Sequence, residues 1–436
     1  MYISKISLKN IRGFKSLEFD LDRGSSEFAG WTVFTGSNGS GKSTLIRAIA
    51  ICIAGKDTAR SFLPSFRGWI REGAGNSESS IQLGIASVST DDTRRGRPSK
   101  APFVAKLAFE RGDGPEPSLV SRSPKKPKKA AVPDQSIWSS NPKGWFACGY
   151  GPFRRVFGAS PEAQRQMSAA STERWVTLFQ EAASLREVDE WLKDLKYKAL
   201  EDKEEQKKEL EILLAILGDE FLPSEIRIDG IDSGGLWLKD ANDVKLSWAE
   251  MSDGYRAALA LLADILRHMI NAYGFDDLYE RDTNGRVNIK RSGIVLIDEI
   301  DAHLHPAWQR KIGFWLKQHF PKVQFLVTSH SPIILQAADP NGLFVLPEAG
   351  STESPHALSP AERLSIVAST PDTALLSEAF GLANTRSEEA VEKRGRYSRL
   401  KAKQHAGVSL SAQEEKEWKQ LELFIYADPE NTDAEG

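Results

Sequence analysis

The stretch "WTVFTGSNGSGKSTLIRAIA", residues 31–50, constrains the fold of this chain more than any other part of the sequence. Residues 31–35 indicate a buried strand, residues 42–54 indicate a helix, and the turn between them fits the spacing G-x-x-x-x-G-K-[ST]. Glycines in such a turn let backbone N–H groups surround phosphate oxygens without clashes from Cβ atoms. The stretch therefore predicts a phosphate-binding loop on a sheet that helices cover.

Residues 36–44, the phosphate loop, are expected to hold ATP together with Mg²⁺. Lys42 would reach the β- and γ-phosphates, Ser43 would bind Mg²⁺, and Thr44 would lie near the α-phosphate. The residues expected to bind ATP here are Gly36, Ser37, Asn38, Gly39, Ser40, Gly41, Lys42, Ser43 and Thr44. A Gly/Ser turn that only caps a helix is the alternative, and the strand–turn–helix context argues against it.

Two carboxylates end the apolar stretch "GIVLIDEID", residues 293–301. Asp298, at the tip of the expected strand, can hold Mg²⁺ through water. Glu299 is placed to accept a proton from an attacking water. An acidic cap for the next helix is the alternative, but the strand is strongly apolar and its pairing with the phosphate loop is coherent. We predict Ser43 and Asp298 as metal residues and Glu299 as a catalytic residue.

The stretch "FLVTSHS", residues 325–331, is a second core strand that ends in polar side chains. His330 stands at its carboxyl end, in the sheet expected to carry Lys42 and Asp298. A histidine there can hydrogen-bond a γ-phosphate, whereas an isolated histidine is more often a structural residue. The position favours a catalytic role for His330.

A second possible anion site opens the helix in "MSDGYRAALALLADILRHM", residues 251–269. Ser252 and Asp253 could cap this helix, because their side chains can accept bonds from its first N–H groups. Ser-x-Gly at a helix start also offers free N–H groups, a hydroxyl and the positive end of the helix dipole. Residues 252–254, the signature segment, are therefore a candidate site for a second phosphate.

These parts together resemble the heads of ABC-type ATPases of the SMC and RecF kind. The sequence looks closest to bacterial RecF-like and OLD-like ATP-binding proteins, some of which are ATPase subunits of phage-defence systems such as Septu. The stretches that carry the resemblance are "NIRGFK", "GYGPFRR", "MSDGYR", "GIVLIDEIDAHLHPAWQRKI" and "QFLVTSHSPIIL". It covers roughly residues 1–55 and 144–346.

The resemblance implies that the signature segment, with Ser252, Asp253 and Gly254, caps the γ-phosphate held by a second copy of the chain. It also implies that Arg12 of "NIRGFK" lies near the nucleotide phosphates; a charge on a hairpin turn is the alternative. An ATP-dependent dimer or higher oligomer is thus expected.

Two departures from the family pattern stand out. Transporter-type ATPases place a glutamine near the γ-phosphate, but the matching stretch "GYGPFRR" has none, and either Tyr150 or Arg154 could take its place. His305 stands where an aspartate is usual in the loop after Glu299. With His303 it could suggest a metal site, yet two histidines without a nearby third ligand are more often residues of a helix start.

The expected fold class is α/β: an ABC-type P-loop ATPase head with a mixed, mostly parallel sheet, a helical insertion and a C-terminal helical extension. Further strands are expected within 2–21 and at 80–88, 103–110, 225–229, 236–239, 244–248 and 323–328, and helices at 306–319 and within 161–218 and 359–427. Polar loops are expected at 89–102 and 111–143, and disorder at 428–436. The expected boundaries are 1–160 for the first lobe of the head, 161–222 for the insertion, 223–346 for the second lobe and 347–436 for the extension.

Composition excludes several classes of protein. The chain is 40% hydrophobic and 27% charged, as in soluble globular proteins, and shows no apolar run that would span a bilayer. Two cysteines cannot build a disulfide framework, and no signal peptide is visible, so a cytoplasmic location is expected. The net charge of −3 gives no global reason to expect nucleic acid, and "SRSPKKPKK" is the one basic run, which a solvated loop explains more simply than DNA contact.

The favoured function is an ATPase whose ATP-dependent dimer regulates or positions an effector, such as a nuclease in an anti-phage defence system. A RecF-like ATPase acting on DNA in repair, and a nucleotide-gated scaffold with slow turnover, are the alternatives. A transporter subunit is disfavoured by the missing glutamine, the form of the signature segment and the helical insertion. No nuclease-like acidic cluster follows residue 346, so other chemistry is expected to belong to a partner.

Overall fold

The computed structural model describes residues 1–88, 90–91, 93–94, 97–98, 102–112, 114–124, 133–139, 144–154, 170–181, 186–201, 203–219, 221–222, 226–351 and 353–426. The chain forms two compact units, Met1–Ala374 and Leu375–Gly436. Among the described residues, every helix is too short or too polar to cross a lipid bilayer.

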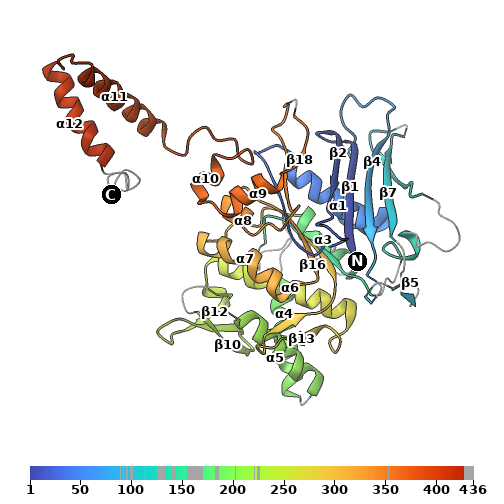
Figure 1. The fold of residues 1–436 in the computed structure, drawn as a ribbon. Helices are drawn as coiled ribbons and strands as arrows, with labels where there is room; N and C mark the ends of the chain where they lie inside the picture. The colour runs from blue at the N-terminus through green and yellow to red at the C-terminus, as the bar shows by residue number, and fades with distance from the viewer. Residues whose placement is uncertain are drawn as a thin grey trace. The chain divides into compact units, whose positions relative to one another are not determined.

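A six-stranded sheet forms the centre of the first unit (Figure 1). Its strands, in spatial order, are β18 (His356–Ala357), β17 (Leu343–Val345), β3 (Gly30–Thr35), β16 (Val323–Thr328), β15 (Gly293–Ile297) and β9 (Ala147–Tyr150). All neighbouring pairs are parallel except β17 with β18. The carboxyl ends of β3, β16, β15 and β9 therefore meet at one edge. The mostly parallel sheet predicted from the sequence is confirmed, but β17 and β18 were not predicted.

An antiparallel sheet packs on the other side of the first long helix. Its strands, in spatial order, are β2 (Phe14–Asp20), β1 (Tyr2–Ile11), β4 (Ser79–Ala86), β7 (Phe103–Glu110) and β8 (Ser118–Ser121). The helix, α1 (Lys42–Phe62), contacts strands of both sheets, and its apolar side chains belong to their shared core. Its buried position fixes the phosphate loop at the edge where the central strands end.

One predicted loop is partly wrong. Strand β8 lies inside the polar stretch 111–143, because buried Leu119 gives this short edge strand an anchor against β7. Two further two-residue strands, β5 (Thr93–Arg94) and β6 (Arg97–Pro98), and a 3-10 turn, η1 (Pro133–Gln135), also lie in stretches predicted as loops. Most of the basic run "SRSPKKPKK", at 125–129, falls outside the described residues.

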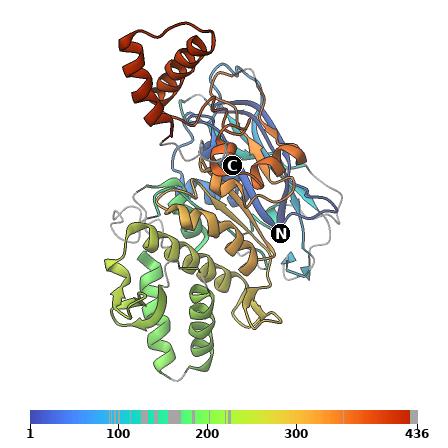
Figure 2. The ribbon, with the colours of Figure 1, turned by 60° about the vertical axis from the view of Figure 1, so that its left-hand side comes forward.

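The helical insertion is confirmed where the structure describes it, with α3 (Ala170–Phe179), α4 (Arg186–Leu200) and α5 (Glu204–Gly218). It leads into three antiparallel strands, β10 (Arg227–Asp232), β11 (Gly235–Lys239) and β12 (Lys245–Ser247), and a 3-10 turn, η2 (Trp248–Glu250). The long helix α6 (Asp253–Tyr273) then packs against α4 and α5, which are green in Figure 2. A short hairpin, β13 (Tyr279–Arg281) and β14 (Val287–Ile289), follows and was not predicted, because each of its strands has only three residues.

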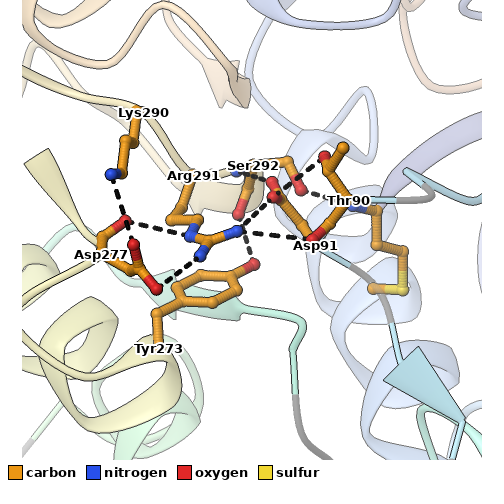
Figure 3. Close-up of polar contacts among 8 residues, drawn as sticks. Thr90, Asp91, Tyr273, Asp277, Lys290, Arg291 and Ser292 are labelled. Carbon is orange, nitrogen blue, oxygen red and sulfur yellow. Dashed lines mark hydrogen bonds and ion pairs between the residues drawn. The ribbon is translucent and has the colours of Figure 1, made fainter. Parts of the chain in front are cut away.

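Polar contacts fasten the amino end of β15 to distant parts of the chain (Figure 3). Asp91 accepts a bond from the Ser292 N–H at 2.7 Å and pairs with Arg291 at 2.8 Å. The Tyr273 hydroxyl at the end of α6 donates to the Ser292 carbonyl at 2.6 Å, and the Met1 amino group donates to the Ser292 hydroxyl at 2.7 Å. These contacts fix the strand at the end opposite its carboxylates.

The predicted helix at 306–319 is confirmed as α7 (Pro306–His319), and α8 (Pro332–Leu335) follows β16. Helices were also predicted within 359–427, and the described residues there form four: α9 (Pro360–Val367), α10 (Pro371–Leu375), α11 (Glu388–His405) and α12 (Ala412–Tyr426). In the second unit, α11 and α12 form a hairpin in which the rings of Tyr397 and Trp418 stack 4.5 Å apart. The disorder predicted for 428–436 concerns residues outside the described part of the chain.

Candidate nucleotide-binding site

The backbone of the phosphate loop has a shape that only glycine allows at two positions. Gly36 has a φ of 148°, and a Cβ there would stand 2.2 Å from the Leu346 carbonyl oxygen. Gly41 has a φ of 99°, and a Cβ there would stand 2.5 Å from the Phe14 ring. Side chains at either position would clash with the neighbouring segment, so the tight curl of this loop depends on both glycines.

The loop presents uncapped N–H groups at the start of α1. Gly41 is the residue before the helix, and no side chain caps the helix start. Ser43 and Thr44 are half-buried in the first turn, while Asn38 and Gly39 are exposed. Ser40 is buried, and its hydroxyl has no partner among the described residues. Free N–H groups at the positive end of a helix are suited to bind phosphate oxygens.

Lys42 places a cation at the centre of the loop. Its Nζ donates to the carbonyl oxygens of Gly36 and Ser37, each at 2.9 Å. Burial lowers the pKa of Lys42, and the nearby carboxylates, first Glu299 and then Asp298, oppose this shift. The phosphate loop and the carboxylates that follow β15 therefore form one electrostatic cluster, although more than 250 residues separate them in sequence.

Asp298 has one carboxylate oxygen held by the protein and one without a partner. Its Oδ1 accepts a bond from the Thr328 hydroxyl at 2.6 Å, and its N–H donates to the Tyr150 carbonyl at 2.8 Å. The side chain is 1% exposed, and its Oδ2 lacks a hydrogen-bond partner among the described residues. A buried, unpaired carboxylate oxygen beside a phosphate loop is suited to bind a hydrated Mg²⁺, so these residues fit the ion.

Glu299 begins a strained turn. Its φ is 48°, unusual for a residue other than glycine, and its N–H donates to the Thr328 hydroxyl at 2.7 Å. Burial raises the pKa of Glu299, as do Asp298 and Asp301, while Lys42 and Arg154 lower it. A carboxylate with a raised pKa is a better proton acceptor than an ordinary one.

His330 lies in the same electrostatic cluster. It follows β16 and is half-buried. Burial lowers its pKa and Lys42 lowers it further, while Asp301 and Asp298 act in the opposite direction. A neutral imidazole at pH 7 can both donate and accept a hydrogen bond. The structure thus brings together Lys42, Asp298, Glu299 and His330.

Arg12 lies on the turn between β1 and β2. Its guanidinium stands over the Trp69 ring, 4.5 Å from the centroid. The backbone N–H of Arg12 donates to the Trp69 carbonyl at 3.0 Å. Burial lowers its pKa, and so does Arg47, which comes from α1. Two neighbouring arginines beside α1 could receive an anion, and contact between Arg12 and phosphate stays a prediction.

The signature segment stands at the start of α6. Ser252 precedes the helix and is exposed, and its side chain makes no capping hydrogen bond, so capping by Ser252 is not its role in this structure. Asp253 pairs with Arg256. A Cβ on Gly254 would stand 2.4 Å from the His303 carbonyl oxygen.

The two candidates for the missing glutamine are both engaged inside the protein. The Tyr150 hydroxyl donates to Asp264 at 2.9 Å and is buried. Arg154 is also buried, and within the described part of the chain it donates only to backbone carbonyls, including those of Asp298 and Glu299. Neither polar group is presented as a free phosphate ligand. No sequence motif predicted these contacts, because every residue has a backbone carbonyl and a motif cannot mark which of them accepts a bond.

His303 and His305 behave as helix-start residues, as predicted. The His305 ring precedes α7 and accepts a bond from the Ala307 N–H at 3.2 Å. His303 has a φ of 66° in the loop before it. In the described part of the chain, no group of three or more His, Cys, Asp or Glu side chains could hold a metal ion.

Two models of AAA domains each match part of this chain, and several curated proteins are similar to it. A family described as "AAA domain, putative AbiEii toxin, Type IV TA system" matches residues 159–336, and a second described as "AAA domain" matches residues 5–220. The chain is 26% identical over 353 residues to the "Septu protein PtuA" of Bacillus mycoides, covering 81% of this chain and 41% of that protein. It is 36% identical over 118 residues to the "Retron Ec83 probable ATPase" of Escherichia coli, covering 27% of this chain and 20% of that protein.

The chain thus spans less than half the length of these two relatives. Among solved structures, the "SmcHead bound to the C-winged helix domain of ScpA" aligns with a TM-score of 0.49 and 18% identity, covering 84% of this chain and 99% of that one. Together, the two matched family models extend from residue 5 to residue 336 and include every element of the site. The matched AAA domains and the Septu and retron relatives support the predicted resemblance to P-loop ATPases of the SMC, RecF and OLD-like group, which includes Septu-like members.

Proposed function

We propose that this chain binds ATP with Mg²⁺, dimerises around it and hydrolyses it, and that this cycle regulates a partner effector. The observation that carries the proposal is the meeting of a buried lysine, an unpaired aspartate oxygen and a glutamate at the edge of the central sheet. We assign residues 1–160 and 223–346 to the ATPase head, 161–222 to an insertion and 347–436 to an extension.

The reaction needs three tasks, and separate side chains of this site can perform them. Lys42 and the N–H groups of the phosphate loop neutralise the β- and γ-phosphates. Glu299 takes a proton from the attacking water, the new bond forms at the γ-phosphorus, and the bond to the β-phosphate oxygen breaks to leave ADP and phosphate. His330 hydrogen-bonds an oxygen of the γ-phosphate. Ser43 and Asp298 would hold Mg²⁺, which would supply positive charge to offset the charge of these oxygens.

Dimerisation is supported by the signature segment. The Ser252 hydroxyl is exposed and makes no bond to the helix that follows it. An uncapped helix start with a free hydroxyl is suited to an anion that comes from outside the subunit. We assign Ser252, Asp253 and Gly254 to the γ-phosphate held by a second copy.

The biological role rests on the relatives. One is named "Septu protein PtuA" and another "Retron Ec83 probable ATPase", and the site proposed above would make this chain an ATPase too. An effector protein, for example a nuclease in a defence system, is the partner we assign. DNA is a possible ligand of the assembly rather than of the site described above.

The deciding experiment is Glu299→Gln. This variant should bind ATP with Mg²⁺ because Lys42 and Asp298 are unchanged, and turnover should fall about 10²–10⁴-fold, the usual contribution of a general base. It should also form a dimer with ATP, measured by light scattering, because slow hydrolysis preserves the bound state. If Glu299→Gln turns over ATP as fast as the wild type does, another residue must be the general base. A wild-type chain that closes on ATP but does not turn it over would favour the scaffold.

A further inference from the structure

Arg154 is a buried cation that bonds only to backbone. Its side chain is 4% exposed, and it forms no ion pair with a carboxylate among the described residues. Its Nη1 donates to the carbonyl oxygen of Gly151 at 2.9 Å and of Asp298 at 3.1 Å. Its Nη2 donates to the carbonyl oxygens of Glu299 at 3.1 Å, Ile300 at 3.3 Å and Ala302 at 3.1 Å. Four of the five acceptors belong to residues 298–302, which we call the carboxylate turn.

The carboxylate turn needs such a donor. Its carbonyls point inward around the guanidinium, and within the turn the Ala302 N–H bonds to the Glu299 carbonyl at 2.9 Å. The positive φ of Glu299 costs free energy, so surrounding contacts must hold that residue in place. Without the guanidinium, several carbonyls of the turn would lose a hydrogen-bond donor, and the turn would be less well held.

We infer that Arg154 is a positioning residue for ATP hydrolysis: it fixes the backbone of the carboxylate turn so that Glu299 can reach the attacking water. The inference rests on the function proposed above. Arg154 touches no reacting atom in this arrangement and acts through Glu299. Strand β9 supports the same turn from the other end, because the Tyr150 carbonyl accepts the Asp298 N–H at 2.8 Å.

The task suits arginine and no other cation. A guanidinium is flat and carries five N–H groups in fixed directions, so it can donate to several carbonyls at once, whereas a lysine has three donors on one atom. Burial lowers the pKa of Arg154 to about 10, with Asp301, Asp298 and Glu299 opposing this shift. The side chain therefore stays charged at neutral pH, and each of its bonds is charge-assisted.

The test uses Arg154→Ala, with Arg154→Lys as a milder variant. We expect Arg154→Ala to lose about 10²-fold in turnover at saturating ATP, the scale expected when a catalytic group is misplaced by about 1 Å. Affinity for ATP should change less than about 3-fold, because the phosphate loop and Lys42 are untouched. Guanidinium chloride at non-denaturing millimolar concentrations should restore part of the turnover of Arg154→Ala, since the ion can occupy the vacated space. Ammonium chloride at the same concentration should not.

Arg174→Ala is the matched control. Arg174 is a half-buried arginine that stands over the Trp145 ring at 4.8 Å and has no bond to the carboxylate turn. Its loss should lower stability without a turnover defect that guanidinium rescues. If Arg154→Ala does not fold, Arg154→Lys takes its place, with a smaller loss of turnover expected.

A second readout does not depend on hydrolysis. Amide hydrogen exchange of Ile300 and Ala302, without nucleotide, should become faster in the Arg154 variants and stay unchanged in Arg174→Ala. Unchanged exchange together with wild-type turnover in Arg154→Ala would overturn the inference, and so would equal losses of turnover in the Arg154 and Arg174 variants. If the wild type itself fails to hydrolyse ATP, the proposed function fails, and the exchange data still decide whether Arg154 holds the turn.

Discussion

Replacing Thr328 by valine should disable the site while keeping its shape. The Thr328 hydroxyl donates to Asp298 at 2.6 Å and accepts the Glu299 N–H at 2.7 Å, so one oxygen fixes both carboxylate residues. Thr328 and Asp298 are fully or almost fully buried. Valine has the size of threonine but lacks the hydroxyl, so water cannot fill the gap easily and both partners lose a bond.

The magnitude follows from these two bonds. A hydrogen bond to a charged group contributes about 1.5–3 kcal/mol, and a buried N–H without an acceptor costs about 1–3 kcal/mol. The free energy of unfolding of Thr328→Val should therefore fall by about 2.5–6 kcal/mol, the sum of the two losses. Turnover should fall about 10²-fold, because the Glu299 backbone is no longer fixed.

Urea unfolding and a phosphate-release assay would measure the two effects. Thr328→Ser is the control, since it keeps the hydroxyl and loses one methyl group, a cost of about 1 kcal/mol. It should retain most of the turnover. Equal stability and equal turnover of the valine and serine variants would refute the reasoning, because the hydroxyl would then have no role at this site.

Three further predictions test other parts of the chain. Lys42→Ala should abolish ATP binding in a nucleotide titration, because the phosphate loop loses its fixed cation; near-native affinity would place the phosphates elsewhere. Asp91→Asn should lower the free energy of unfolding by about 1–3 kcal/mol at pH 7, since it removes the charge paired with Arg291. Burial raises the pKa of Asp91, but bonds from Ser292 and Arg291 lower it more. The stability difference between wild type and Asp91→Asn should therefore shrink as the pH falls through the acid range. A stability difference that stays constant with pH in urea unfolding would contradict this. Burial, together with the charge of Glu205, raises the pKa of Glu209 to about 7, so the native state loses stability as the pH rises from about 4.5 through 7. Glu209→Gln should therefore be more stable than wild type at pH 8, by about 1–3 kcal/mol, but not at pH 4. Equal melting temperatures of the two proteins at pH 8 would count against this prediction.

The sequence predicted the central strands because their apolar runs end in motif residues. Thr35 and Thr328 are buried at two strand ends, and Asp298 follows a third, which is the arrangement expected when parallel strands end at one edge. The strands that were missed, β5, β6, β8, β13, β14, β17 and β18, have two to four residues each. Short strands are formed by pairing with neighbours, and a single sequence does not show which neighbours they have.

The candidate site was predictable for residue types that carry their own chemistry and unpredictable for those that act through backbone. Lys42, Asp298 and Glu299 stand in motifs whose spacing states their role. The sequence offered Arg154 only as one of two candidates for the missing glutamine, and four of its five backbone acceptors lie 144 to 148 residues further along the chain. The sequence does not show that Arg154 and the carboxylate turn are neighbours, so this contact is seen only in the folded structure.

Ser252 and Gly254 differ in what a substitution can test. Any side chain at Gly254 would press on the His303 carbonyl of the same chain, close to the carboxylate turn. A Gly254→Ala variant would therefore lose activity even if the signature segment never met a second copy. Ser252 is exposed and free of capping bonds, so Ser252→Arg perturbs only what approaches from outside.

The mixing experiment with Ser252→Arg follows from that difference. Ser252→Arg alone should be inactive, and so should Lys42→Ala alone, because each homodimer lacks one half of every site. A mixed dimer would pair the intact phosphate loop of the Ser252→Arg chain with the intact signature segment of the Lys42→Ala chain, and up to one site per dimer could work. Some activity should return on mixing. Normal hydrolysis by Ser252→Arg, with a Glu299→Gln chain that stays monomeric at saturating ATP and Mg²⁺, would show that the segment serves only to start α6.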